Sequence, residues 1–368
     1  MSSDDASAVR IPVHAIKGRG TATRMAHRFE ADARAAYDDG WGTLDEAAIA
    51  GQALPPTQVI FEDAKSVLTG NDSPDIFFEQ AINPYRGCEH GCTYCYARPT
   101  HSYLGLSPGL DFETKIIAKR NIAQVLREEL SRKSYVPRSL NVGSATDAYQ
   151  PVERELRLTR SLIEVLLETR HAFSLITKSS GIERDLDLIV PMAEKSLAAT
   201  YVTITTLDSA LARKLEPRAA SPARRLRTIR TLAEAGVPVG VSVAPQIPFI
   251  NEDMEQVLEA AAQAGASSAF YTVLRLPWEL APLFRQWLEL HYSQRADRVM
   301  ARVQDMRGGK DYDSSFASRM KGQGLWADLL KQRFEKTCAR LGLNRQRVEL
   351  DLSAFRPASR IAGQGHLF

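Results

Sequence analysis

The stretch NPYRGCEHGCTYCYARPTH, residues 83–101, contains three of the four cysteines of this 368-residue chain. Cys88, Cys92 and Cys95 are spaced as CxxxCxxC, and a tyrosine stands on each side of the last cysteine. Four cysteines are too few for a disulfide scaffold in a chain of this length. In a reducing compartment, a tight group of thiols more often binds a metal or takes part in catalysis. The stretch therefore predicts a metal site with three thiolate ligands.

Two kinds of metal site fit these three thiols, because thiolates select zinc or iron–sulfur clusters. A structural zinc ion takes four ligands, and His90 or His101 would complete such a set. In a 4Fe–4S cluster, three thiolates would instead bind three irons and leave the fourth iron open to a substrate or cofactor. The spacing by itself leaves both interpretations open.

From about residue 78, short β-rich runs alternate with amphipathic stretches, as in a series of βα units. The predicted strands are FFEQAI (77–82), SLNVGS (139–144), AFSLIT (172–177), TYVTITT (200–206), VPVGVSVA (237–244) and AFYTVLRL (269–276). Helical signals lie between them; Ser221 and Pro222 predict a helix start, and Gly236 predicts its end. The pattern predicts an α/β fold, a partial (β/α)6 TIM-like barrel with an N-terminal hairpin and a C-terminal helical extension. The cysteine loop follows the first strand, at the end of the barrel where chemistry is expected.

The chain divides by composition and pattern into five expected parts. Residues 1–55 form a partly disordered extension, residues 56–80 a hairpin leading into the barrel, and residues 81–278 the barrel core. Residues 279–350 form a helical region, and residues 351–368 a polar tail that ends in QGHLF.

The overall composition, 44% apolar and 25% charged, is ordinary for a globular protein. The N-terminus lacks an apolar stretch after a basic start, and the sequence has no run of about 18 apolar residues. We therefore expect no secretory signal and no membrane span, and a cytoplasmic location.

The net charge of +3 says little, but its distribution is uneven. Seven basic residues between Arg213 and Arg230 face one acid, Glu216, and a second basic run follows between Lys331 and Arg347. These runs are either solvated helix faces or contacts to a phosphate backbone. The stretch GGKDYDSSFASRMKGQGLW (308–326) is likewise either a phosphate-contacting loop or a surface turn.

The cysteine spacing, in the loop after the first strand of a predicted partial barrel, resembles that of the radical S-adenosylmethionine (SAM) enzymes. Within them, the spore photoproduct lyase-like (DNA repair photolyase-like) subgroup is similar over roughly residues 80–275. The similarity includes CTYCY, GSATDAYQPVE after the second strand, ITKSS after the third, and Glu216-Pro217 followed by arginines. In that family a 4Fe–4S cluster reductively cleaves SAM to a 5′-deoxyadenosyl radical, which abstracts hydrogen from the substrate. The resemblance therefore implies a 4Fe–4S cluster, SAM, and an electron donor such as flavodoxin or ferredoxin.

The resemblance also implies roles for residues of this chain. The cluster ligands would be Cys88, Cys92 and Cys95. The expected SAM contacts are Tyr94 (adenine), Ser144, Thr146 and Asp147 (methionine amino group), Lys178 (methionine carboxylate), and Thr203 and Thr205 (ribose). Hydroxyls at strand ends often only satisfy the backbone, and a lysine there is often solvated, so each role has a structural alternative. The catalytic residue is left unknown, with Tyr96 as the candidate.

One position departs from the lyase pattern. The lyase returns hydrogen to its product radical through a cysteine three residues before the aspartate, where this chain has Ser144. A serine O–H bond is much stronger than a thiol S–H bond, so serine is a poor hydrogen donor to a carbon radical. Cys338 lies in a predicted helix and is interpreted as a small buried hydrophobe. We therefore expect this chain to generate the radical as the lyase does, and we do not expect it to catalyse the lyase reaction.

We predict a radical SAM enzyme, of lyase or transferase type, that acts on nucleic acid in DNA repair or modification. The alternatives are the same chemistry on a protein or small molecule, and a non-catalytic binding protein with a structural metal site. The terminal Gln364, Leu367 and Phe368 resemble the short peptide that bacterial partners insert into the sliding clamp. A Leu-Phe pair on a polar tail would be an exposed apolar anchor for such a pocket.

Overall fold

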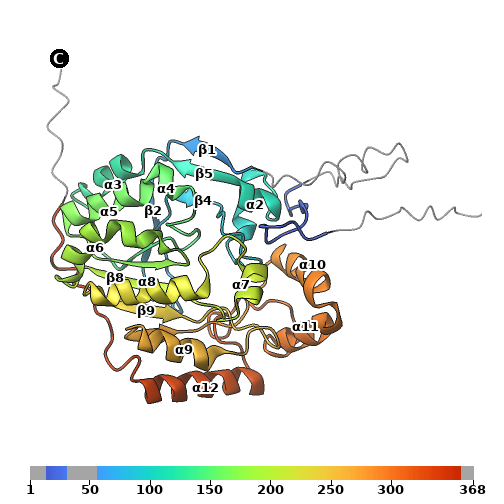
Figure 1. Ribbon diagram of the computed structural model, residues 1–368. Helices are drawn as coiled ribbons and strands as arrows, with labels where there is room; N and C mark the ends of the chain where they lie inside the picture. Colours follow the sequence, from blue (N-terminus) through green and yellow to red (C-terminus); the bar gives the residue numbers. More distant parts are fainter. Residues whose placement is uncertain (1–13, 31–55, 358–368) are drawn as a thin grey trace, which may run out of the picture.

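The computed structural model describes residues 14–30 and 56–357, and a mainly parallel sheet forms its centre (Figure 1). Its strands, in spatial order, are β10 (Ser268–Phe270), β9 (Val239–Ser242), β8 (Ala198–Thr203), β7 (Phe173–Thr177), β6 (Leu140–Val142), β3 (Gln80–Ile82) and β2 (Leu68–Gly70). Six of them pair in parallel, and β2 pairs antiparallel with β3. All six predicted strands are present, each shorter than its apolar run. The predicted α/β fold with a partial (β/α)6 barrel is confirmed.

Helices between the strands cover the outer face of this sheet (Figure 1). They are α3 (Ile122–Leu130), α5 (Leu158–Thr169), α6 (Leu186–Ala193), α8 (Pro222–Glu234) and α9 (Met254–Gln263), with the one-turn α4 (Glu153–Leu156) before α5 and the 3₁₀ helix η2 (Ser180–Asp185) before α6. The short α7 (Ser209–Leu215) packs instead against the cysteine loop. Apolar residues spaced three and four apart place one stripe of each long helix on the sheet, as Leu126 and Leu258 show by their complete burial. The Ser221 hydroxyl caps α8 by accepting from the Arg224 amide (3.3 Å), and Gly236 follows the helix end with a positive φ. Both predicted boundary signals of α8 are therefore correct.

A separate small sheet corrects the predicted hairpin. It contains β1 (Gln58–Glu62), β5 (Lys115–Lys119) and β4 (Tyr85–Arg86), with β1 parallel to β5. The hairpin that leads into the barrel consists of β2 and β3 alone, joined by residues 71–79. The assignment of β1 to the hairpin was wrong because its partner lies more than 50 residues away along the chain. A local hydrophobic pattern cannot identify so distant a partner.

The region after the barrel is helical, as predicted. It contains α10 (Leu280–Tyr292), the 3₁₀ helix η3 (Ser293–Arg295), α11 (Ala296–Asp305) and α12 (Leu325–Leu341). Helices α10 and α11 share an apolar cluster with Cys92 and Tyr94 of the cysteine loop, whereas α12 packs beside α9 (Figure 1). Across the described residues, no helix is both long enough and apolar enough to cross a membrane.

Residues 14–30, within the expected disordered extension, dock against the segment that follows the cysteine loop. That segment contains η1 (Arg98–Leu104) and α2 (Leu110–Thr114). The Glu113 carboxylate accepts hydrogen bonds from the amides of Gly20 (2.9 Å) and Thr21 (3.1 Å), and it pairs with Arg98 at 2.6 Å. A Cβ on Gly20 would lie 1.7 Å from the Gly91 carbonyl oxygen, so this close approach requires glycine. The docked segment thus buttresses the cysteine loop.

Candidate active site

The three clustered cysteines lie in the loop after β3, at the carboxyl ends of the parallel strands. Cys88 and Cys92 are buried, Cys95 is half-buried, and none forms a disulfide. The turn is held by backbone hydrogen bonds from Gly91 to Cys88 and from Cys95 to Cys92, each 3.3 Å long. Gly91 has a φ of +67°, in the left-handed region that favours glycine. The glycine in the CxxxC spacing is therefore required by the turn that presents the thiols.

The electrostatic setting of these thiols favours ligation over exposure to water. Burial raises the pKa of Cys88 well above its ordinary value, and burial raises the pKa of Cys92 to about 12. Both thiols therefore resist ionisation unless a cationic group takes the place of their protons and balances the thiolate charge. A donor set of three thiols, two of them buried, suits a metal cluster, since metal binding would offset the cost of burying thiolates.

The two histidines considered as a fourth ligand are engaged elsewhere. His90 Nδ1 lies 3.2 Å from the Asp147 carboxylate, and His101 Nε2 lies 3.0 Å from the Lys115 carbonyl oxygen. Within residues 14–30 and 56–357, no group of three or more His, Cys, Asp and Glu side chains is arranged around a single ion. The described side chains, the three cysteines included, are thus not arranged as a formed site for zinc or for a cluster.

A buried network behind the loop is centred on Glu216. Its carboxylate accepts hydrogen bonds from the hydroxyls of Tyr94 and Thr205 and pairs with the guanidinium of Arg225. Burial opposes ionisation of Glu216, but Arg225 and Lys178 outweigh burial and lower its pKa to about 2. Burial, and then the charge of Glu216, raise the pKa of Tyr94 well above its ordinary value, so the phenol is the donor. The network ties the cysteine loop to the end of β8 and to α8.

Lys178 follows β7 directly and extends toward this network. Its Nζ lies 5.8 Å from the centroid of the Tyr94 ring. Burial opposes its charge, but Cys92 and Glu216 raise the pKa of Lys178 above its usual value, so the ammonium is charged. Among the described residues, this ammonium forms no direct ion pair with a carboxylate and donates no hydrogen bond. It is therefore a charged donor beside the thiols with capacity to bind an anionic group.

The residues expected around the methionine amino group differ in how many hydrogen bonds their side chains already form within the protein. The Thr146 hydroxyl donates to the Gly87 carbonyl at 2.6 Å. The Asp147 carboxylate accepts from the Thr177 hydroxyl and the Lys178 amide, both at 2.7 Å. Burial alone would raise the pKa of Asp147, but His90 and these donors lower it below its ordinary value. Both residues thus join strand ends, whereas the Ser144 hydroxyl has one side-chain contact among the described residues, a 3.3 Å hydrogen bond that it accepts from the Asn83 amide.

The two threonines of the fourth parallel strand are also brought to this end of the barrel. Thr203 ends β8, and its carbonyl accepts a 2.9 Å hydrogen bond from Arg225. Thr205 follows the strand, and its hydroxyl bonds to Glu216 at 2.5 Å. The structure places both side chains in buried positions, and it commits the hydroxyl of Thr205 to the Glu216 network.

Tyr96 lies at the mouth of the site beside an arginine that the sequence reasoning missed. Its ring is 48% exposed, and its hydroxyl donates to the Ser144 carbonyl. The guanidinium of Arg275 lies 5.3 Å from the ring centroid. Arg275 follows the last parallel strand, and its position at a strand end was the available signal.

Some members of the basic runs pair with acids of the protein, and others are exposed. Arg225 is fully buried against Glu216, and Arg224 pairs with Glu183 at 2.6 Å. In the loop 308–326, Arg319 pairs with Asp75 at 2.5 Å, and Lys321 donates to the Tyr271 carbonyl. Arg224 and Arg225 in the first run, and Arg319 in the loop, are therefore already paired, whereas Arg213, Arg227 and Arg230 are exposed and form no ion pair within the described residues.

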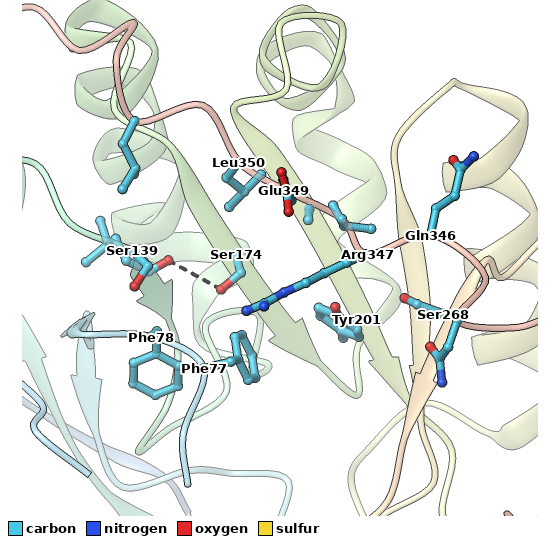
Figure 2. Close-up of a pocket in the computed structure, with 15 residues that line it drawn as sticks. Phe77, Phe78, Ser139, Ser174, Tyr201, Ser268, Gln346, Arg347, Glu349 and Leu350 are labelled. Atoms are coloured by element: carbon cyan, nitrogen blue, oxygen red, sulfur yellow. Dashed lines mark hydrogen bonds between the residues drawn. The ribbon is translucent and has the colours of Figure 1, made fainter. Parts of the chain in front are cut away.

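A cavity of about 620 Å³ lies at the opposite end of the barrel (Figure 2). Ser139, Ser174 and Ser268 line it at the amino ends of their strands, and Arg347 extends into it from the segment after α12. The cysteine loop, Lys178 and the Glu216 network instead follow the carboxyl ends. The cavity is therefore separate from the candidate active site.

Most of the candidate site lies within the residues that a family model matches. The family model for the Radical SAM superfamily matches residues 82–261, from β3 through most of α9. An uncharacterized protein of Mycobacterium tuberculosis is 35% identical over 224 residues, which is 60% of this chain and 66% of that protein. An uncharacterized protein of Methanocaldococcus jannaschii is 25% identical over 213 residues, 58% of this chain and 76% of that protein. The aligned part of this chain thus spans slightly less than two thirds of the mycobacterial protein.

Among solved structures, a spore photoproduct lyase mutant with bound AdoMet and dinucleoside spore photoproduct is 17% identical with a TM-score of 0.48. The alignment covers 77% of this chain and 80% of that chain. Gln364, Leu367 and Phe368, which suggested a sliding-clamp peptide, lie outside the described residues.

Proposed function

We propose that Cys88, Cys92 and Cys95 hold a 4Fe–4S cluster for SAM cleavage, as in the radical S-adenosylmethionine superfamily, whose family model matches residues 82–261. When bound, the cluster would supply the electron that splits the SAM sulfonium into methionine and a 5′-deoxyadenosyl radical, which abstracts hydrogen from the substrate. One observation carries the proposal: three thiols, two of them buried and one half-buried, occupy a single loop at the carboxyl ends of the parallel strands.

The chain's own residues would bind and orient SAM. Lys178 offers a charged, unpaired ammonium to the methionine carboxylate, a contact of about 1.5–3 kcal/mol for a charge-assisted hydrogen bond. Ser144 offers its hydroxyl to the methionine amino group, while Thr146 and Asp147 hold the strand ends on which it stands. The backbone beside Tyr94 would meet the adenine. Thr203 would reach the ribose more readily than Thr205, whose hydroxyl already bonds to Glu216.

We propose nucleic acid as the substrate, in DNA repair or modification. The support is the resemblance of the motifs to those of a DNA-repair lyase, together with the arginine beside the mouth of the site. Because Ser144 replaces the lyase cysteine, the product radical would need another hydrogen donor. Tyr96 is the candidate catalytic residue, since its half-exposed phenol adjoins the last cysteine. Flavodoxin or ferredoxin is the proposed source of electrons.

The experiment is anaerobic purification followed by assay with SAM and a reductant. A brown, iron-containing protein that forms 5′-deoxyadenosine, and that incorporates deuterium from a labelled oligonucleotide into it, is the expected result. A protein and a small-molecule mixture, labelled in the same way, test the alternative substrates. A colourless protein without iron, or iron without SAM cleavage, would contradict the proposal and favour a non-catalytic metal site.

The sliding-clamp interaction stays a prediction. It is tested by recovery of the clamp on the full chain and on a chain without its last five residues, QGHLF. Equal recovery would end it.

A further inference from the structure

Three strongly exposed aromatic side chains gather around one arginine near the mouth of the barrel. Phe29, Tyr103 and Trp278 are 56%, 67% and 61% exposed. The guanidinium of Arg28 lies 4.7 Å, 4.9 Å and 4.4 Å from their ring centroids. We call these four residues the aromatic platform. Single exposed aromatics are common on protein surfaces, but a contiguous exposed group often marks an interaction site.

The platform is fixed in place by contacts between distant segments. Arg28 forms a two-pronged ion pair with Glu279, with Nη1 at 2.9 Å and 2.7 Å from the two carboxylate oxygens, and its amide donates to the same carboxylate. Trp278 has a φ of +48°, a conformation that is strained for a bulky side chain. Arg28 covers one side of each ring, and the rings of Phe29 and Tyr103 are tilted by 43° to each other. Because Glu279 neutralises Arg28, the platform presents the remaining exposed surfaces of the three rings with little net charge.

The platform is connected to the candidate active site at two points. Tyr103 belongs to η1, which begins three residues after Cys95. Trp278 follows Arg275 by three residues, a separation of at most about 11 Å along the chain. The guanidinium of Arg275 lies against Tyr96, and its Nε is buried without a hydrogen-bond partner. In the described residues, Arg275 has no carboxylate within ion-pair distance, and its Nη1 donates to the Met320 sulfur at 3.5 Å.

We propose that the aromatic platform binds the nucleobases of an unpaired nucleic-acid strand, and that Arg275 binds a phosphate of the same strand. This inference rests on the proposed function and names how its substrate is held. Every base has a flat π-face, so exposed aromatic rings bind single strands with little sequence preference. A base must also leave the duplex stack before chemistry in a buried site can reach it. A strand that entered the site would first meet the rings of the aromatic platform and then the guanidinium of Arg275 beside Tyr96.

The test measures binding of a fluorescently labelled single-stranded oligothymidylate to the anaerobically purified full chain. Trp278→Leu keeps an apolar side chain but removes the π-face, and Tyr103→Leu does the same on η1. Loss of one stacked base should weaken binding about tenfold. The matched control is Phe61→Leu, an equally exposed aromatic on β1 in the small sheet. Arg275→Gln should also weaken binding and should reduce its salt dependence, because a phosphate contact releases counterions and a stacking contact does not.

The result that supports the inference is weaker binding by Trp278→Leu and Tyr103→Leu at every salt concentration, with Phe61→Leu unchanged. Binding by the parent chain that neither substitution weakens, or no binding of the oligothymidylate at all, would overturn it. Formation of 5′-deoxyadenosine from SAM without substrate is measured on the same samples. Retained SAM cleavage with failed strand binding refutes the platform alone, whereas loss of SAM cleavage in the parent chain refutes the proposed function.

Discussion

The hydroxyl of Tyr94, the residue before the last clustered cysteine, donates a hydrogen bond to the buried carboxylate of Glu216. The two residues are separated by more than 120 positions along the chain, and Arg225 supplies the opposite charge. The position of the cysteine loop therefore depends on an ion pair that lies behind it, at the end of β8. The ionised carboxylate is the centre of this arrangement because it accepts from three side chains at once.

Glu216→Gln should destabilise the protein strongly, because it leaves the guanidinium of Arg225 buried without its counter-charge. We expect a loss of about 3–5 kcal/mol in the free energy of unfolding, measured by urea denaturation. Tyr94→Phe removes one donor and leaves the ion pair intact, so it should cost about 1–3 kcal/mol. Equal losses for the two variants would show that the charge of Glu216 is not what matters.

Alanine in place of Cys88, Cys92 or Cys95 should each lower the iron content of anaerobically reconstituted protein to a small fraction of the parent value. Cys338→Ala should keep its iron, since Cys338 lies in α12 and packs among apolar residues. Iron is measured by colorimetric assay beside the visible absorption spectrum. Full iron content in a chain lacking all three clustered cysteines would refute the ligand assignment.

Lys178→Met should weaken SAM binding about 10- to 100-fold, the equivalent of a lost charge-assisted hydrogen bond. Iron content should be unchanged, because Lys178 is not a ligand. Lys214→Met is the control: its Nζ lies 4.9 Å from the ring centroid of Tyr292, on the side of α7 toward α10. Equilibrium dialysis without oxygen measures the dissociation constant. An unaltered constant in Lys178→Met would remove this residue from the SAM site.

Gly20→Ala should detach residues 14–30 from the cysteine loop, because a Cβ there would overlap the Gly91 carbonyl oxygen. The expected result is faster proteolytic cleavage within this segment and a lower melting temperature. Gly70→Ala provides a matched control, since a Cβ on Gly70 meets no atom within 4 Å. Similar cleavage rates in the two variants would contradict the docking.

His171 should make the protein less stable as the pH falls. Burial lowers its pKa from 6.5 to about 4, so the folded state keeps the imidazole neutral while the unfolded chain binds a proton. His171 therefore contributes fully to the free energy of unfolding above about pH 6.5. This contribution falls by about 3 kcal/mol as the pH drops to about 4. His171→Gln removes this contribution, so its stability should fall less steeply over that range. Parallel stability curves for parent and variant would be inconsistent with a buried neutral histidine.

The sequence predicted those features that local patterns encode. The six parallel strands, the caps of α8 and the cysteine loop depend on neighbouring residues, and the structure contains them all. The pairing of β1 with β5 depends on residues far apart in the chain, and no local sequence pattern indicates it. The sequence pattern also grouped Arg225 with the surface charges, because a run of charged residues does not show which side chain turns inward. Its partner Glu216 lies within the same run. A charge pattern reports composition, and only the fold decides which charges meet.

The exposed platform was missed for a different reason. Its members come from three separate segments, and none of the segments carries a recognisable motif. The site contacts around SAM were placed by resemblance to a family, and the geometry then separates residues with free polar atoms, such as Lys178, from those already bonded, such as Thr146.

The docking of Gly20 and Thr21 on Glu113 has a consequence for biosynthesis. More than 90 residues separate the two sides of this contact, so the ribosome finishes the early segment well before its partner emerges. The cysteine loop is translated in the interval between them. A nascent chain consequently exposes its three clustered thiols before residues 14–30 can dock beside them.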